Sequence, residues 1–272
     1  MEEKSFRGNG NTSADILKRL DFERRSTGET SLQGEVVRER SLDGSECSIV
    51  YSHCTTTQEV DEVIHHEISL AEERKYILEW KVYDHDTPLD LKDRLLAAGF
   101  EPGPVESLMV LPVKEEALAA FEAPAYDLKH IDDSAGLDDV AAISRETGRT
   151  DADDEKRRLA LTLRDAPDQM SVYVAYIDGE AVACGRIHFK GNSEFAELYG
   201  GRTKTTRRNQ GLYTALVAAR LKEALERNRK YIVVDALPTS EPILRKRGFQ
   251  FVTHTQPFVY RPRSWGTVSG AA

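Results

Sequence analysis

The sequence predicts an α/β protein in which helices cover a mixed sheet, and three patterns in its 272 residues point to this class. The pairs Asp43-Gly44 and Asp178-Gly179 each lie between alternating apolar and polar runs, the pattern of a β-hairpin. Apolar residues recur at helical spacing over 211–228. The β-branched run KYIVVDAL, residues 230–237, is typical of a strand buried on both faces, as in a sheet with helices on both sides.

The first unit is predicted to span residues 13–120 and to have an α+β order of its own. Ser13 is expected to cap the first helix and Asp90 the last, while Gly99 ends that last helix because glycine adopts the left-handed conformation easily. The expected elements are helices over 13–20, 56–75 and 90–98, a hairpin within 34–54, and strands over 77–86 and 106–113.

A boundary near Pro124 separates this unit from a second one, predicted to span residues 125–263. Its expected order is a strand over 127–131, helices over 136–148 and 151–165, a hairpin over 171–190, a strand over 193–203, a basic loop over 204–210, a helix over 211–228, a strand over 230–237, a helix over 240–248, and final strands over 249–254 and 258–262.

The charge balance excludes some classes of function. The net charge is −9, and residues 1–120 carry 14 Lys and Arg against 25 Asp and Glu. An acidic chain is not expected to be a general nucleic-acid binder. No apolar run reaches the length of a membrane span, and the N-terminal residues show no secretory signal. Three cysteines with no zinc-ligand spacing predict no metal site and a reducing, cytoplasmic location.

The segment that bears chemistry is ELYGGRTKTTRRNQGLY, residues 197–213. A strand leads into a basic loop, and Gly211 opens directly onto a long helix. Backbone N–H groups at such a helix start are unpaired, and the helix dipole favours negative charge there. The sequence therefore predicts either a phosphate site or a solvated basic loop with a glycine cap. The spacing fits neither a Walker loop nor a dinucleotide fingerprint.

Arg208 to Tyr213, RNQGLY, resembles motif A of the GNAT N-acetyltransferases, [QR]-x-x-G-x-[GA], with Tyr213 in place of the usual small residue. A tyrosine can adopt the helical conformation that this position needs. The preceding hairpin and the later SEPILRKRGF, which ends in Gly248-Phe249, are similar to the same family. The resemblance covers about residues 127–262 and implies a tandem GNAT-like acyl-CoA N-acyltransferase fold.

The resemblance implies that two parallel strands separate and open a cleft for acetyl-CoA, the co-substrate. Gly200-Gly201 would allow the backbone bulge that this separation needs. The strand backbone would bind the pantetheine arm, the loop and first helical turn the pyrophosphate, and arginine side chains a CoA phosphate. By position, the expected cofactor-binding residues are Gly201, Arg202, Thr203, Arg207, Arg208, Asn209, Gln210, Gly211, Leu212, Tyr213, Thr214 and Ser240.

Acetyl transfer to an amine needs a base, and Glu197 stands about where histone-acetyltransferase-like members of the family carry theirs. The alternatives are that Glu197 is a solvated or ion-paired strand residue, or that Glu194 is the base. Many members place a tyrosine acid at the position that spacing assigns to Leu244. Tyr213, Ser240 and solvent are the candidate replacements.

The first unit resembles a degenerate GNAT-like repeat without motif A, because the order of elements over 35–113 follows that over 172–258. It would wall the acceptor pocket, and its acidic excess would attract a cationic amine. The leading hypothesis is an N-acetyltransferase that moves an acetyl group from acetyl-CoA to a small or peptide primary amine, by direct attack in a ternary complex. The alternatives are a non-catalytic acyl-CoA-binding or regulatory module and a longer acyl donor. The acceptor and the oligomeric state stay open.

Overall fold

The structure is a computed structural model that describes residues 12–26, 28–30, 36–54 and 56–263. Its first half contains α1 (Ser13–Ser26), β1 (Glu29–Thr30), β2 (Val36–Arg40), β3 (Glu46–Ser52), α2 (Thr57–Arg74), β4 (Ile77–Tyr83), α3 (Leu91–Ala97), β5 (Glu101–Pro102), β6 (Glu106–Pro112), α4 (Glu115–Leu118) and a 3₁₀ turn (Ala119–Phe121).

The second half contains β7 (Asp127–Ile131), α5 (Ser134–Glu146), α6 (Ala152–Asp165), a 3₁₀ turn (Pro167–Gln169), β8 (Met170–Ile177), β9 (Glu180–Phe189), β10 (Phe195–Thr203), a 3₁₀ turn (Thr205–Arg207), α7 (Leu212–Glu226), β11 (Tyr231–Ala236), α8 (Glu241–Lys246) and β12 (Gln250–Tyr260). The predicted α/β class is confirmed, and both Asp-Gly pairs connect antiparallel strands.

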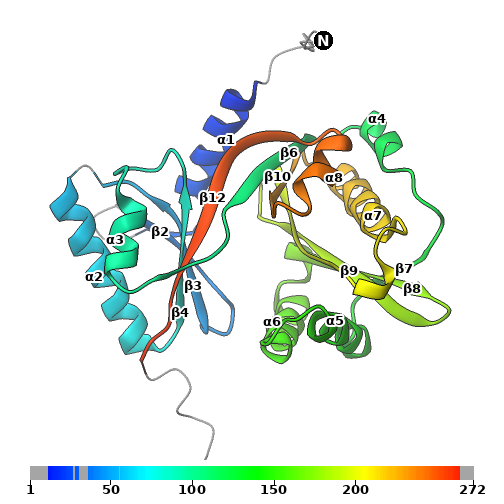
Figure 1. Ribbon diagram of the computed structural model, residues 1–272, viewed down its shortest axis with the longest axis horizontal. Coiled ribbons are helices and arrows are strands. Elements are labelled where there is room, and N and C mark those ends of the chain that lie inside the picture. Colours follow the sequence, from blue (N-terminus) through cyan, green and yellow to red (C-terminus); the bar gives the residue numbers. More distant parts are fainter. Residues whose placement is uncertain (1–11, 27, 31–35, 55, 264–272) are drawn as a thin grey trace, which may run out of the picture.

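The described strands form one mixed sheet that runs through both halves in the order β1-β2-β3-β4-β12-β6-β11-β10-β9-β8-β7, with β5 beside β12. The last strand of each half crosses over: β6 pairs with β11, and β12 pairs with β4 and β6. Figure 1 shows β12 running from α8 across to β4. The two halves thus share a continuous ladder, and the boundaries 13–120 and 125–263 stay a prediction.

The helices cover different parts of the two sheet faces. In the second half, α7 packs on the face that includes Ile187, Ala196 and Ile232. Residues of α5 and α6 pack on the opposite face over β8 and β9. Leu20 of α1 packs on that same opposite face, nearer the centre of the sheet. The part of this face between α1 and the pair α5–α6 holds the polar side chains described below.

The predicted cap of α1 is wrong, and the predicted cap of α3 is at the right residue but makes no side-chain cap bond. Thr12, not Ser13, caps α1: its hydroxyl accepts from the Asp15 N–H at 3.2 Å, and the Asp15 carboxylate accepts from the Thr12 N–H at 3.1 Å. The Asp90 carboxylate makes no cap bond and instead accepts from Arg94 Nε at 2.9 Å. The cap thus lies one residue earlier than expected at α1, and the Asp90 carboxylate is occupied by an arginine of the first turn at α3.

The two predicted final strands are one continuous strand, β12, and Pro257 lies within it. Proline removes one donor from a ladder, which is why the sequence favours a break at this point. β12 is paired along both edges, however, and the Pro257 carbonyl still accepts from the Gly103 N–H at 2.8 Å. Pairing on both sides therefore outweighs the missing donor.

Candidate functional site

The centre of the site is the point where β10 and β11 separate. These parallel strands pair from Phe195–Tyr231 to Glu197–Val233 and no further. Beyond Glu197, β10 stays with β9 and changes register between Tyr199 and Arg202, while β11 stays with β6. Two strands that follow different neighbours leave a gap between them with free backbone edges, as the resemblance implies.

Glycine suits the bulge because Gly200 is left-handed and because side chains lie close to both glycines. Gly200 has a φ of 60°, and a Cβ there would lie 2.7 Å from Nη1 of Arg186. A Cβ on Gly201 would lie 2.9 Å from the ring of Tyr213. The tyrosine in motif A thus packs behind the bulge in β10, in contact with a residue that has no side chain.

The loop after β10 directs a run of N–H groups towards one place. Gly211 caps α7 with a φ of 88°, and Asn209 is also left-handed, with a φ of 62°. Within the described residues, no acceptor is recorded for the N–H groups of residues 209–214. The Arg208 N–H reaches the Thr205 carbonyl at 3.5 Å. Successive free amides at the positive end of a helix form an anion site.

Most basic side chains of this loop form ion pairs within the protein and are therefore less available to bind a phosphate. Arg202 pairs with Glu155 at 3.2 Å, and Lys204 pairs with Glu180 at 2.8 Å. Arg207 also reaches Glu180, at 3.4 Å. Among the described residues no ion pair is recorded for Arg208, which is exposed. Arg208 is therefore the loop cation best placed to meet a phosphate.

A cavity of about 1240 Å³ joins this loop to the first half of the chain. It is larger than most small-molecule pockets, which are roughly 300–1,000 Å³. All the expected cofactor-binding residues except Gln210 line it. The Gln210 carbonyl accepts from the Tyr126 hydroxyl instead. Glu197 also lines the cavity, whereas Glu194 pairs with Arg19 and Lys230 and does not.

Glu197 is held as an anion. Its carboxylate lies 3.1 Å from Nζ of Lys190 and accepts from the Tyr199 hydroxyl at 2.7 Å. Burial alone would raise the pKa of this carboxyl, but Lys190, the Tyr199 hydroxyl and Lys81 outweigh burial and lower the pKa to about 2. Glu197 is therefore ionised at neutral pH and is a weak base on its own.

The position that spacing assigns to the family's tyrosine acid does not face the cavity. Leu244 is fully buried in the hydrophobic core. The residues of the α8 segment that line the cavity are Ser240, Ile243 and Arg247, which recur at helical spacing. The Ser240 hydroxyl donates to the Leu237 carbonyl at 3.1 Å. Burial raises the pKa of Tyr213, so its hydroxyl stays protonated.

The first half contributes side chains that sequence reasoning missed: Glu79, Lys81 and Glu106 line the cavity together with Asp235 of β11. Lys81 pairs with Asp235. Burial, and secondarily the charge of Asp235, raises the pKa of Glu106 to about 7 against the opposing effect of Lys81. The available signal was the alternation in ILEWKVY, where Glu79 and Lys81 share one face of the strand.

Residues 137–249 match the family model described as the acetyltransferase (GNAT) family. They form a GNAT domain. Members of this family transfer acyl groups from acetyl-CoA, and the match makes acyl transfer the activity to test for this part of the chain. No curated protein matches the chain. No described helix of the protein is long and apolar enough to cross a membrane.

Solved structures extend the GNAT fold over both halves. A GCN5-related N-acetyltransferase from Kribbella flavida is similar over 93% of this chain and 97% of its own, at 16% identity and a TM-score of 0.65. A functionally unknown protein from Staphylococcus epidermidis is similar over 87% and 95%, at 15% identity and a TM-score of 0.65. A tandem GNAT protein of the clavulanic acid biosynthesis pathway is similar over 80% and 75%, at 14% identity and a TM-score of 0.57.

Proposed function

We propose that the protein is an acetyl-CoA-dependent N-acetyltransferase that acetylates a primary amine by direct attack in a ternary complex. The observation that carries this proposal is one cavity that joins the split between β10 and β11, the free N–H groups of residues 209–214 and an acidic wall from the first half. An anionic acyl donor held by the N–H groups and a cationic amine held by the acidic wall can thus meet at the split.

The donor side is argued from the backbone. Free N–H groups of residues 209–214, with Arg208 beside them, suit the pyrophosphate. The free edge of β10 at Gly201, Arg202 and Thr203 suits the amides of the pantetheine arm, because β10 no longer pairs with β11 there. Together these two sets of groups would bring the thioester to the split beside Glu197.

The chemistry needs a neutral amine, which attacks the thioester carbon. The acceptor ammonium first loses one proton; the carbon–nitrogen bond then forms, the carbon–sulfur bond breaks, and the attacking nitrogen loses a second proton. We assign the removal of the first proton to Glu197 acting through water, since its carboxylate is ionised and lines the cavity, and the second proton passes to solvent. Solvent can protonate the departing thiolate, because a thiol has a pKa of about 8.5 and its anion leaves readily near neutral pH.

The first prediction concerns Glu197. Glu197→Gln is expected to lower kcat for thiol release by about 100-fold, because general base catalysis contributes roughly 10²–10⁴-fold. The dissociation constant of acetyl-CoA should stay unchanged. Since the pKa of Glu197 is about 2, wild-type activity should show no loss from its protonation above pH 5. Steady-state kinetics from pH 5 to 9 and calorimetric titration with acetyl-CoA measure both quantities.

Glu194→Gln is the matched control, because Glu194 precedes the same strand but does not line the cavity. Full activity of Glu197→Gln would refute the assigned base. A wild type that binds acetyl-CoA yet releases no thiol with any amine would favour the second candidate, a non-catalytic acyl-CoA-binding or regulatory module. The buried Leu244, at the position that spacing assigns to the family's tyrosine acid, is the observation that favours this candidate.

The second prediction is one acetyl-CoA per chain. In the first half α2 stands where α7 stands in the second, between two parallel strands, β3 and β4. Thr56 and Glu59 form a capping box at the start of α2, so their side chains occupy N–H groups that a phosphate would need, and Glu59 adds negative charge. Calorimetry should give a stoichiometry of one. A value of two would contradict the proposal that this half has lost CoA binding.

A further inference from the structure

The acidic wall of the cavity comes from neighbouring strands whose side chains point to one side of the sheet. Across β12, Glu79 of β4 is opposite Val259, and Glu106 of β6 is opposite Thr255. Asp235 of β11 lies on the same side, since its alternate residues Tyr231 and Val233 pack under α1 on that face. Glu79, Lys81, Glu106 and Asp235 therefore face one space.

Two carboxylates of this acidic wall lack the ion pairs that neighbouring charged side chains make. Lys81 and Asp235 pair with each other, and Lys190 lies 2.8 Å from Glu39 and 3.1 Å from Glu197. Within the described residues, neither a hydrogen bond nor an ion pair is recorded for Glu79 or for Glu106. The wall that the first half supplies thus holds two uncompensated acids.

Glu79 and Glu106 are partly buried, and removing a charged group from water is costly unless an opposite charge is near. Burial raises the pKa of Glu79, with Lys81 opposing this and Glu46 and Asp235 adding to it. Burial likewise raises the pKa of Glu106, and the charge of Glu79 contributes. Lys81 is the cation of this wall and is already paired with Asp235, so a further positive group inside the cavity would stabilise both carboxylates.

We propose that Glu79 and Glu106 bind positively charged nitrogens of the acceptor, and that the acceptor is an aliphatic polyamine. This inference rests on the proposed function, because it names the substrate class of the same cavity. The two glutamates lie four positions apart along β12 and on opposite sides of it, so one compact ammonium group cannot contact both. A flexible chain with several amino groups can bind both while a further amine reaches the split.

The test is calorimetric titration of the full chain, saturated with CoA, with a linear triamine such as spermidine and with a monoamine of equal length. Wild type should bind the triamine at least tenfold more tightly. Glu79→Gln and Glu106→Gln should each weaken triamine binding about tenfold, the size expected for losing one charged hydrogen bond. Monoamine binding should change little. Glu101→Gln is the control, because Glu101 is exposed on β5 and pairs with Arg261 outside the cavity.

Equal affinity for triamine and monoamine in wild type would overturn the inference, and so would unchanged triamine binding in both variants. A thermal melt of each variant shows whether it is folded, and Glu→Gln at a partly exposed carboxylate with no ion-pair partner is not expected to lower Tm. The readout needs no turnover. Failure of the proposed function would appear in two separate measurements. Calorimetric titration with CoA would give no heat, or a turnover assay with acetyl-CoA would show no thiol release.

Discussion

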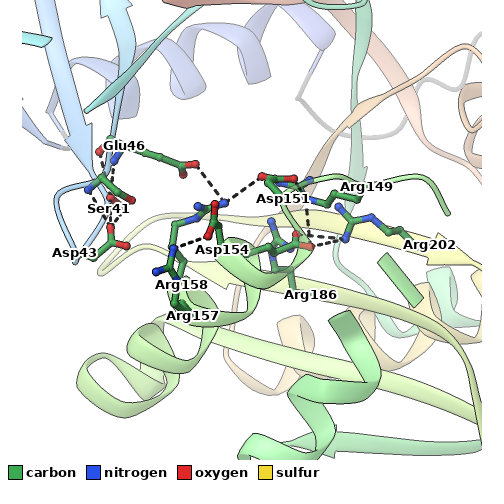
Figure 2. Close-up of polar contacts among 12 residues, drawn as sticks. Ser41, Asp43, Glu46, Arg149, Asp151, Asp154, Arg157, Arg158, Arg186 and Arg202 are labelled. Carbon is green, nitrogen blue, oxygen red and sulfur yellow. Dashed lines mark hydrogen bonds and ion pairs between the residues drawn. The ribbon is translucent and has the colours of Figure 1, made fainter. Parts of the chain in front are cut away.

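Replacing Glu155 by Gln is expected to destabilise the protein by about 3 kcal/mol near neutral pH, as expected for a buried ion pair that loses one partner. Glu155 of α6 is almost fully buried and meets three arginines: Arg186 at 2.7 Å, Arg202 at 3.2 Å and Arg149 at 3.4 Å. Figure 2 shows these three arginine side chains converging. Glutamine keeps the size but leaves the arginines without their shared negative charge.

The pKa of Glu155 predicts how the stability difference between wild type and Glu155→Gln depends on pH. Burial opposes ionisation of Glu155, but Arg186, Arg202 and Arg149 outweigh burial and lower its pKa to about 2. A carboxyl whose pKa is lowered by folding stabilises the native state above its unfolded pKa of about 4.3 and loses that contribution as pH falls. The gap in Tm between wild type and Glu155→Gln should therefore be full at pH 7 and should narrow below pH 4.

Asp154→Asn is the control, because Asp154 lies on the same helix and, within the described part of the chain, pairs only with Arg157 at the surface. Its effect should be a few tenths of a kcal/mol, typical of an exposed pair. Urea denaturation at pH 7 compares the two variants. If Glu155→Gln were as stable as Asp154→Asn, the three arginines would not depend on Glu155 for their charge balance.

Local patterns in the sequence were sufficient for most elements of the fold. The hairpins at Asp43-Gly44 and Asp178-Gly179 and the helix after Gly211 are confirmed, because their signals lie within a few residues of one another. The splayed strands followed from the GNAT resemblance carried by residues 208–213. The roles of Glu197 and the CoA-binding residues stay predictions.

Long-range pairing could not be predicted. The exchange of β6 and β12 depends on contacts between residues far apart in the chain, such as Phe258 with Trp80. Arg202 and Lys204 look like free cations in the sequence, yet acids on α6 and β9 pair with them. The acidic wall at Glu106 has the same origin, since it exists only because β6 lies beside β11.

The other large effect is expected from Gly211→Ala, which should weaken acetyl-CoA binding about tenfold or more. The φ of 88° at Gly211 costs a residue with a side chain about 1–2 kcal/mol, and relaxation of that strain would turn the free N–H groups of residues 209–214 away from one another. Tenfold in a dissociation constant corresponds to about 1.4 kcal/mol. Calorimetric titration with acetyl-CoA measures the change.

Gly191→Ala is the matched control for Gly211→Ala, because a Cβ at Gly191 would meet no atom within 4 Å and its φ is not left-handed. It should bind acetyl-CoA like wild type. The 3′-phosphate of CoA can reach side chains outside the loop, so loss of affinity for dephospho-CoA as well as for CoA would point to the pyrophosphate. If Gly211→Ala bound both ligands as tightly as wild type, the N–H groups of residues 209–214 would not hold the pyrophosphate. The acyl-donor side of the cavity would then have to be assigned elsewhere.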